Sequence, residues 1–312
     1  MLNLAIISRD YLVYQALFEQ HHERFTQINL SFCGKQANEC ELKTANIILS
    51  EPDLAAQFIE QCTSLQWLQS TWAGNNKLQQ HPKRDYILSG VKGIFAQQMR
   101  EYVMAYLLYF QRKIASFQNL QNAHIWQSHP IETLQGKTLG IMGLGNIGIE
   151  VAKTAQHFGM RINAITRNSE PLKDAHYFTV SQLTTFAKEC DFIVNLLPQT
   201  QQTEGLCTDA FFKAMKATAV FINAGRGSIV DSEQTLVKAL QQQEIAAAVL
   251  DVFLQEPLAA TSSLYQAPNC YITNHTAAVS QTDRVFEVFI QNLECFTHQQ
   301  RLLYVHNFER GY

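Results

Sequence analysis

Two hydrophobic patterns alternate along the first ninety residues of this 312-residue chain. Short apolar runs, typical of buried strands, are separated by stretches in which apolar positions recur every three or four residues, as on one face of a helix. The runs predict strands at residues 4–8, 45–50 and 65–70, and the periodic stretches predict helices around residues 11–23 and 52–62. Strands alternating with helices of this length predict a small α/β domain with a parallel sheet.

A longer helical pattern follows this first series. Residues 101–120, EYVMAYLLYFQRKIASFQNL, are expected to form one helix whose first half is apolar on nearly every face. A helix without a polar side needs to be covered all round. Two kinds of cover remain open: burial between two domains, or entry of residues 102–110 into a subunit interface. The second predicts a homodimer.

A second α/β series begins at Lys137. Its expected strands are residues 138–142, 161–166, 192–197, 219–223 and 246–250, and its expected helices are residues 147–158 and 232–243. A last helix at residues 281–297 leads into a tail, LLYVHNFERGY, that has no place in this series. We therefore expect the tail to return to the first domain, with the chain crossing near residues 96–100 and 279–284.

The start of the second series carries three glycines, Gly143, Gly145 and Gly148, in G-x-G-x-x-G spacing. The first allows a tight turn, the second lets the backbone approach a pyrophosphate, and the third lets helix and strand pack closely. Asn146 and Ile147 stand at the start of the following helix, whose N-terminus carries a partial positive charge that favours the pyrophosphate. Because a strand precedes the motif and a helix follows it, the pattern predicts dinucleotide binding rather than a structural turn.

The end of the next strand bears on the choice of dinucleotide. An acid about 20 residues after the motif would bind the adenosine ribose hydroxyls and repel a 2′-phosphate. Residues 164–168, AITRN, contain no acid, and Thr166 and Arg167 offer a hydroxyl and a guanidinium instead. These groups suit a phosphate, which favours NADP over NAD. The alternative is that Arg167 is a solvated surface residue.

Composition narrows the class of protein further. The net charge is −3 without a block of like charges, so neither nucleic acid nor an anionic membrane is an expected partner. The seven cysteines are scattered, which fits a reducing compartment and predicts no metal site. The N-terminal MLNLAIISRDYLV lacks the features of a signal peptide, and the apolar run at residues 102–110 is far shorter than the ~20 residues that span a bilayer. We expect a cytoplasmic protein.

Motifs along nearly the whole chain resemble the D-isomer-specific 2-hydroxyacid dehydrogenases, especially their glyoxylate/hydroxypyruvate reductase-like branch. They are LQSTWAG (68–74), LQGKTLGIMGLGNIG (134–148), NLLPQTQQTEG (195–205), FINAGRGSIVD (221–231), LDVFLQEPL (250–258), TNHTAA (273–278) and the closing FERGY. The resemblance implies two doubly wound parallel-sheet domains. A Rossmann dinucleotide-binding domain, residues 99–280, would be inserted into a flavodoxin-like substrate domain of residues 1–98 and 281–312.

The resemblance also implies a catalytic trio of Arg226, Glu256 and His275. His275, as imidazolium, would give a proton to the alkoxide that develops when hydride reaches a keto carbon. Glu256 would orient the ring and keep it protonated. Arg226 would hold the substrate carboxylate and carbonyl through its planar fork.

Further contacts are carried over in the same way. Ala73 and Gly74 match the loop that grips the substrate carboxylate with backbone N–H groups, together with Arg226. This loop departs from the family pattern, since Asn75 and Asn76 follow it and Trp72 precedes it, which leaves substrate size open. The cofactor contacts implied by the resemblance, beyond the glycine loop and the Thr166–Arg167 pair, are Leu197, Pro198, Thr203, Ala224, Arg226, Asp251 and His275.

The function that these residues predict is reduction of a small 2-keto acid, similar to glyoxylate or hydroxypyruvate, to a D-2-hydroxy acid with NADP(H) or NAD(H). Two alternatives on the same fold stay open. One is a nucleotide-sensing, corepressor-like binding protein, against which the absence of an appended basic segment argues. The other is a formate or phosphite dehydrogenase, against which the pairing of Glu256 with His275 argues.

Overall fold

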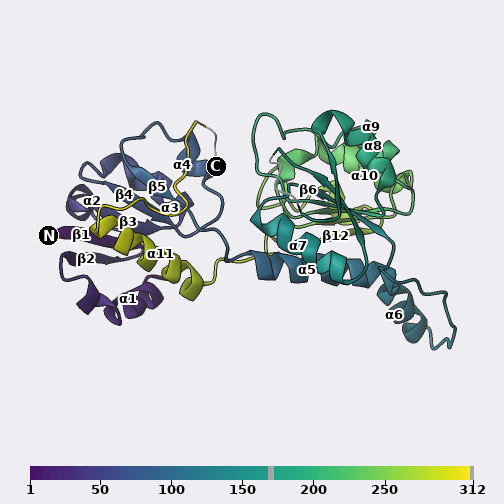
Figure 1. Cartoon of the computed structure of the whole chain (residues 1–312), viewed down its shortest axis with the longest axis horizontal. Helices are drawn as coiled ribbons and strands as arrows, with labels where there is room; N and C mark the ends of the chain where they lie inside the picture. The colour runs from purple at the N-terminus through teal and green to yellow at the C-terminus, as the bar shows by residue number, and fades with distance from the viewer. Residues whose placement is uncertain (168–171, 310–312) are drawn as a thin grey trace. The chain divides into compact units, whose positions relative to one another are not determined.

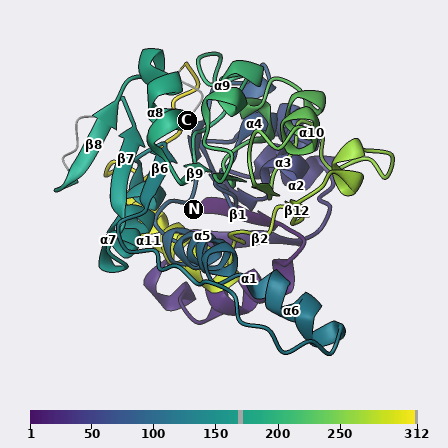
Figure 2. The same cartoon turned by 90° about the vertical axis from the view of Figure 1, so that its right-hand side faces the viewer.

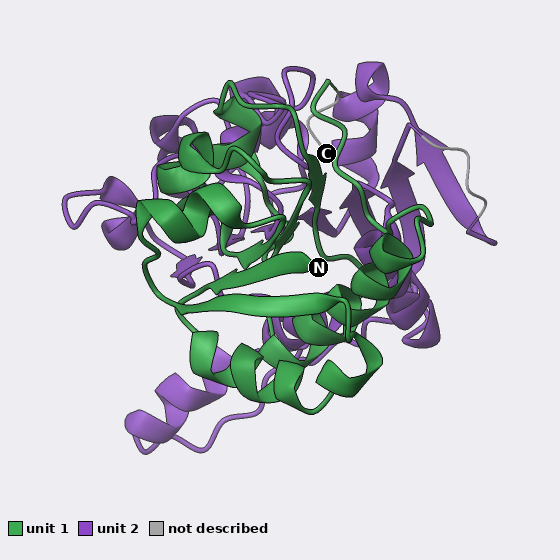
Figure 3. Cartoon of the chain, turned by 90° about the vertical axis from the view of Figure 1, so that its left-hand side faces the viewer, with its two compact units in different colours: residues 1–94, 280–312 green, residues 95–279 purple. Residues whose placement is uncertain are grey.

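The computed structural model describes residues 1–167 and 172–309. Asn168 and the last three residues of the FERGY motif lie outside the described residues. The chain forms two compact units (Figures 1 and 3). Unit 1 comprises residues 1–94 and 280–312, and unit 2 comprises residues 95–279.

Unit 1 is a parallel five-stranded sheet flanked by helices. The strands are β1 (Leu2–Ile7), β2 (Ile28–Gly34), β3 (Ile47–Ser50), β4 (Trp67–Ser70) and β5 (Ile87–Ser89), in the order β2-β1-β3-β4-β5. The helices are α1 (Tyr11–Glu19), α2 (Glu39–Thr44), α3 (Pro52–Phe58), α4 (Asn76–Gln80) and α11 (Thr282–Thr297). This strand order is that of the flavodoxin-like fold, as expected.

Buried hydrogen bonds attach the C-terminal segment to the sheet of unit 1. Asn292 of α11 is fully buried, and its amide nitrogen donates to the side-chain oxygen of Gln69 in β4 at 2.8 Å. Its amide oxygen accepts from the backbone of Leu303 at 2.7 Å, and the Gly90 amide donates to the Tyr304 carbonyl at 3.0 Å. The tail is therefore part of the same core as the N-terminal strands.

Unit 2 contains a parallel seven-stranded sheet. Its strands are β6 (Thr138–Met142), β7 (Arg161–Ile165), β8 (Ala175–Phe178), β9 (Phe192–Asn195), β10 (Val220–Asn223), β11 (Ala247–Leu250) and β12 (Cys270–Ile272). The order β12-β11-β10-β9-β6-β7-β8 is the Rossmann order extended by one strand. Chain direction across the sheet reverses between β6 and β9, the position at which such sheets bind ligands.

Helices cover both faces of this sheet (Figure 2). The helices of unit 2 are α5 (Ala96–Gln111), α6 (Ile114–Asn122), α7 (Asn146–His157), α8 (Leu183–Glu189), α9 (Asp209–Ala214) and α10 (Glu233–Gln241), and all of them except α6 pack against the sheet. Helices α8, α9 and α10 contribute to the apolar core on one face, and α5 and α7 contribute to the core on the other. Burial on both faces explains why the central strands are continuous apolar runs.

The prediction of a single helix over residues 101–120 is wrong. Lys113 has a left-handed backbone, with φ of 52°, and it separates α5 from α6. Helix α5 buries one face, formed by Met99, Val103, Met104 and Leu107, in the core that it shares with α7. Helix α6 has no buried residue, so no core contact stabilises residues 114–122 as a continuation of α5.

Three further features concern the cysteines, metal sites and membrane spans. All seven cysteines are free thiols. Among residues 1–167 and 172–309, no cluster of three or more His, Cys, Asp or Glu side chains is arranged to hold a metal ion. No described helix is both long enough and apolar enough to span a bilayer.

Candidate active site

The glycine-rich loop joins β6 to α7 at the point where the sheet reverses. Gly143 has φ of 105°, a conformation that L side chains rarely adopt, and its amide donates to the Ile165 carbonyl at 2.9 Å. A Cβ at Gly143 would lie 3.0 Å from the carbonyl carbon of Leu196, so this loop contacts the segment that follows β9. The first glycine is needed for both the turn and the contact.

The space in front of this loop suits a pyrophosphate. A Cβ placed on Gly145 would meet no described atom within 4 Å, and Gly145 caps the twelve-residue helix α7, which begins at Asn146. The first amides of a helix have no intrahelical acceptor and carry partial positive charge. The open cradle and the helix N-terminus together fit the pyrophosphate of a dinucleotide.

The loop after β9 lies beside the glycine loop and contains three of the expected cofactor residues, Leu197, Pro198 and Thr203. The Thr203 hydroxyl donates to the Pro198 carbonyl at 2.6 Å and accepts from the Thr200 amide at 2.9 Å. Its hydrogen bonds therefore shape the loop itself.

Thr166 and Arg167 directly follow β7. The guanidinium of Arg167 donates to the side-chain oxygen of Gln202 at 3.0 Å. Gln202 belongs to the loop after β9, so this bond holds the exposed arginine toward the cofactor loop. Gln202 is a residue that the sequence analysis missed.

His275 and Glu256 form a close pair in the loops that follow β12 and β11. Nδ1 of His275 lies 2.7 Å from Oε2 of Glu256, and Oε1 of Glu256 accepts from the Phe253 amide at 3.0 Å. Since Nδ1 faces the carboxylate, Nε2 is the ring nitrogen that remains for a substrate. The His275 side chain is 52% exposed, which makes that nitrogen accessible.

The pair shifts the proton affinity of both partners. The hydrogen bond to Glu256 raises the pKa of His275 above its usual value, against an opposing effect of burial. Burial alone would raise the pKa of Glu256, but hydrogen bonds from His275 and Phe253 outweigh it and lower that pKa. The arrangement therefore favours imidazolium beside carboxylate, the charge state that a general acid needs.

Arg226 follows β10 and is the third member of the expected trio. Its Nη1 donates to the Gly225 carbonyl at 2.7 Å, and its own carbonyl accepts from the Asn223 side chain at 3.1 Å. Burial lowers the pKa of Arg226, which Glu256 partly offsets. A partly desolvated guanidinium of this kind is suited to bind an anion.

The loops of Arg226 and Glu256 also contact each other directly. Gly227 packs so tightly that a Cβ would lie 1.9 Å from the carbonyl carbon of Phe253. Phe253 is the residue whose amide binds Glu256. The positions of the arginine and of the carboxylate are therefore coupled through backbone contact.

Asp251 is 2% exposed, and its carboxylate is occupied by groups of the protein. It accepts from the Thr273 hydroxyl at 2.6 Å and from the amides of Thr276 and Ala277 at 2.8 and 3.1 Å. Asp251 thus stabilises the loop that carries His275.

Ala224, another expected cofactor residue, is buried directly after β10, and its amide donates to the Asn195 carbonyl at 3.2 Å.

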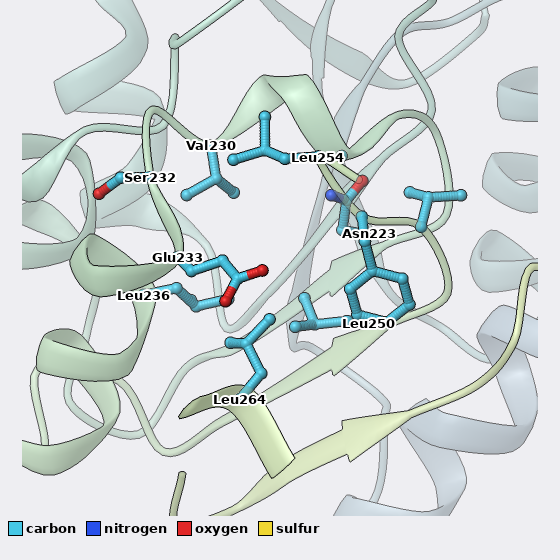
Figure 4. A pocket seen from close by; sticks show the side chains of 11 residues that line it. Asn223, Val230, Ser232, Glu233, Leu236, Leu250, Leu254 and Leu264 are labelled. Carbon is cyan, nitrogen blue, oxygen red and sulfur yellow. The ribbon is translucent and has the colours of Figure 1, made fainter. Parts of the chain in front are cut away.

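A small pocket lies beneath these loops (Figure 4). Figure 4 shows that its walls are largely the apolar side chains of Val230, Leu236, Leu250, Leu254 and Leu264. None of the expected site residues lines it. An apolar space without these residues cannot perform the expected chemistry, so the candidate active site remains the set of loop ends above it.

Ala73 and Gly74 lie in unit 1, between β4 and α4. The preceding Trp72 is 39% exposed, and the guanidinium of Arg9 lies 5.9 Å from the centroid of its ring. Arg9 forms a bidentate pair with Asp53, with distances of 3.0 and 2.6 Å. These side chains lie near the carboxyl ends of β1, β3 and β4, where open α/β sheets bind ligands.

Comparison with known proteins identifies the family of this chain. The profile described as "D-isomer specific 2-hydroxyacid dehydrogenase, NAD binding domain" matches residues 104–277. Glyoxylate/hydroxypyruvate reductase A of Yersinia enterocolitica is 31% identical over 218 residues, covering 69% of each protein, and glyoxylate/hydroxypyruvate reductase B of Klebsiella pneumoniae is 36% identical over 208 residues, covering 64% of each. The crystal structure of a D-isomer specific 2-hydroxyacid dehydrogenase family protein from Aeromonas salmonicida is 34% identical, with a TM-score of 0.89 over 98% of this chain and 99% of that one.

The fold and the loop residues define a dinucleotide-dependent oxidoreductase. The chain belongs to the D-isomer-specific 2-hydroxyacid dehydrogenase family, in its glyoxylate/hydroxypyruvate reductase-like branch. It is an NAD(P)-dependent 2-hydroxyacid dehydrogenase. The family and fold predicted from the sequence motifs are thereby confirmed.

Proposed function

We propose that this enzyme reduces a small 2-keto acid, similar to glyoxylate or hydroxypyruvate, to a D-2-hydroxy acid, with His275 as the general acid. The observation that carries the proposal is the 2.7 Å contact between His275 and Glu256 in the same unit as the glycine-rich loop. Bound reduced nicotinamide supplies the hydride. His275 gives its Nε2 proton to the oxygen that becomes the alcohol, and Glu256 stabilises the ring while it is charged.

Arg226 positions the substrate in this proposal. Its guanidinium matches the planar geometry of a carboxylate and can also contact the neighbouring carbonyl oxygen. Holding both groups fixes the keto carbon for attack and draws electron density toward the oxygen that His275 protonates. Partial burial of Arg226 supports this role, because a cation with less water around it binds an anion more strongly than a fully solvated one does.

We further propose that NADP is the preferred cofactor. Residues 164–167 provide no carboxylate to repel a 2′-phosphate. Arg167 is held by Gln202 beside the cofactor loop, where its guanidinium can bind that phosphate. From the family resemblance we also assign cofactor binding to unit 2, and binding of the substrate carboxylate to Ala73 and Gly74 of unit 1.

We also propose that the enzyme is a cytoplasmic homodimer. Large apolar side chains are exposed in and after α6, the helix that extends beyond the rest of unit 2 in Figures 1 and 2. They are Ile114, Ile125, Trp126 and Ile131. Exposed apolar surface of this kind is typical of a protein–protein interface. In the proposed homodimer, a second copy of the chain covers it. The seven free thiols suit a reducing compartment.

The test of the proposed reaction is a panel of glyoxylate, hydroxypyruvate, pyruvate and phenylpyruvate, each with NADPH and with NADH. The expected result is keto-acid-dependent oxidation of the cofactor, fastest with glyoxylate or hydroxypyruvate. Binding of dinucleotide without turnover of any keto acid would support the corepressor-like alternative instead.

A further inference from the structure

Hydrogen bonds connect α5 to the loop that carries His275. The hydroxyl oxygens of Tyr102 and Thr273 lie 2.9 Å apart, and the Thr273 hydroxyl donates to Oδ1 of Asp251 at 2.6 Å. A hydroxyl has one proton to donate. Because that of Thr273 goes to Asp251, Tyr102 donates to Thr273. The chain of donors therefore runs from the helix to the buried carboxylate.

Asp251 holds the loop on both sides of His275. Its carboxylate accepts from the Thr273 hydroxyl on one side and from the Thr276 and Ala277 amides on the other. Its backbone carbonyl accepts from the His275 amide at 2.8 Å. His275 itself has φ of 57°, a left-handed conformation that is unfavourable unless its surroundings hold it. The orientation of the ring thus depends on the position of Asp251.

We propose that Tyr102 and Thr273 are positioning residues for the general acid: they fix the carboxylate of Asp251 and thereby the orientation of His275 toward Glu256. The proposal rests on the proposed function. Both residues act through Asp251 rather than on the substrate. Tyr102 is suited to the role because it packs in the core that α5 shares with α7, so its hydroxyl has a rigid base.

The electrostatics of the loop give this arrangement a measurable signature. The charged groups that face His275 are Glu256, Arg226 and Asp251, and the hydrogen bond to Glu256 is the largest cause of its raised pKa. A loop that moves and lengthens this bond lowers the pKa of His275. Burial raises the pKa of Tyr102, so its phenol keeps the proton that it donates.

The experiment compares full-length wild type with Tyr102→Phe, Thr273→Val and Thr273→Ser. Tyr102→Phe should lower kcat for the keto acid about 3- to 10-fold, the range for one lost neutral hydrogen bond. Thr273→Val should lower it about 10-fold or more, because it also removes a donor from a buried carboxylate. In both variants the basic limb of the kcat/KM profile should move to lower pH. Thr273→Ser keeps the hydroxyl and should retain most of the wild-type kcat.

A matched control is Tyr106→Phe on the same helix, because the Tyr106 hydroxyl has no hydrogen bond among the described residues. It should leave kcat and the pH profile unchanged. Melting temperatures and NADPH affinity, followed by cofactor fluorescence, report whether each variant is folded. An unaltered basic limb in both folded variants would overturn the proposal, even if kcat fell. If wild type reduces no keto acid at all, the proposed function fails, which is a separate outcome.

Discussion

Nδ1 of His275 lies 2.7 Å from a carboxylate oxygen of Glu256, although 19 residues separate them in the chain. The two loops follow the adjacent parallel strands β12 and β11, whose carboxyl ends meet at one edge of the sheet. The fold therefore brings together an acid–base pair that neither loop could form alone. This pair is the basis of the proposed proton transfer.

Removal of the Glu256 charge should change the pH dependence of the enzyme. In the direction of keto-acid reduction His275 has to be protonated, so kcat/KM falls as pH rises through its raised pKa. Glu256→Gln removes the main cause of that elevation, and the basic limb should move to lower pH. The measurement is kcat/KM against pH. Glu287→Gln, an exposed carboxylate paired with Arg284, is the control and should leave the limb in place.

Replacement of Arg226 should weaken substrate binding and turnover together. Arg226→Lys keeps the charge but loses the planar pair of donors, so KM for the keto acid should rise on the order of tenfold or more while kcat falls. Steady-state kinetics with saturating cofactor measure both constants. Arg161→Lys at the exposed start of β7 serves as the matched control. An unchanged KM in Arg226→Lys would show that the carboxylate binds elsewhere.

The cofactor preference should depend on the end of β7. Wild type should prefer NADPH over NADH by roughly tenfold, the low end for one charge-assisted hydrogen bond, because Arg167 is exposed. Thr166→Asp combined with Arg167→Ala should reverse the preference and leave KM for the keto acid nearly unchanged. The values to compare are kcat/KM for the two cofactors. A wild-type preference for NADH would mean that Arg167 does not bind the 2′-phosphate and would contradict the predicted preference for NADP.

The central strands could be predicted from the sequence, but the edge strands could not. All four strands that the hydrophobic pattern missed, β2, β5, β8 and β12, are the edges of the two sheets. A central strand is buried on both faces and is a continuous apolar run, such as that of β10. An edge strand such as β8, AHYF, is partly exposed and has no such run. The break between α5 and α6 was missed for a related reason, since the turn at Lys113 has no glycine or proline to mark it.

The candidate site shows the same division. Glycine spacing and motif order pointed to the cofactor loop and to the three loops with Arg226, Glu256 and His275, because those residues have chemistry that stands out. Tyr102, Gln202 and Thr273 did not stand out, since tyrosine, glutamine and threonine are common in ordinary positions. Their roles depend on hydrogen bonds between segments that are far apart in the chain, as between Tyr102 and Thr273.

The central claim is that His275 delivers the proton in keto-acid reduction. The most direct test is single-turnover oxidation of NADPH by wild type and by His275→Gln, with glyoxylate and hydroxypyruvate as substrates. In His275→Gln the rate should fall on the order of 100-fold or more, the range for loss of a general acid, while NADPH affinity is retained. A His275→Gln variant that reduces either keto acid at the wild-type rate would contradict the claim.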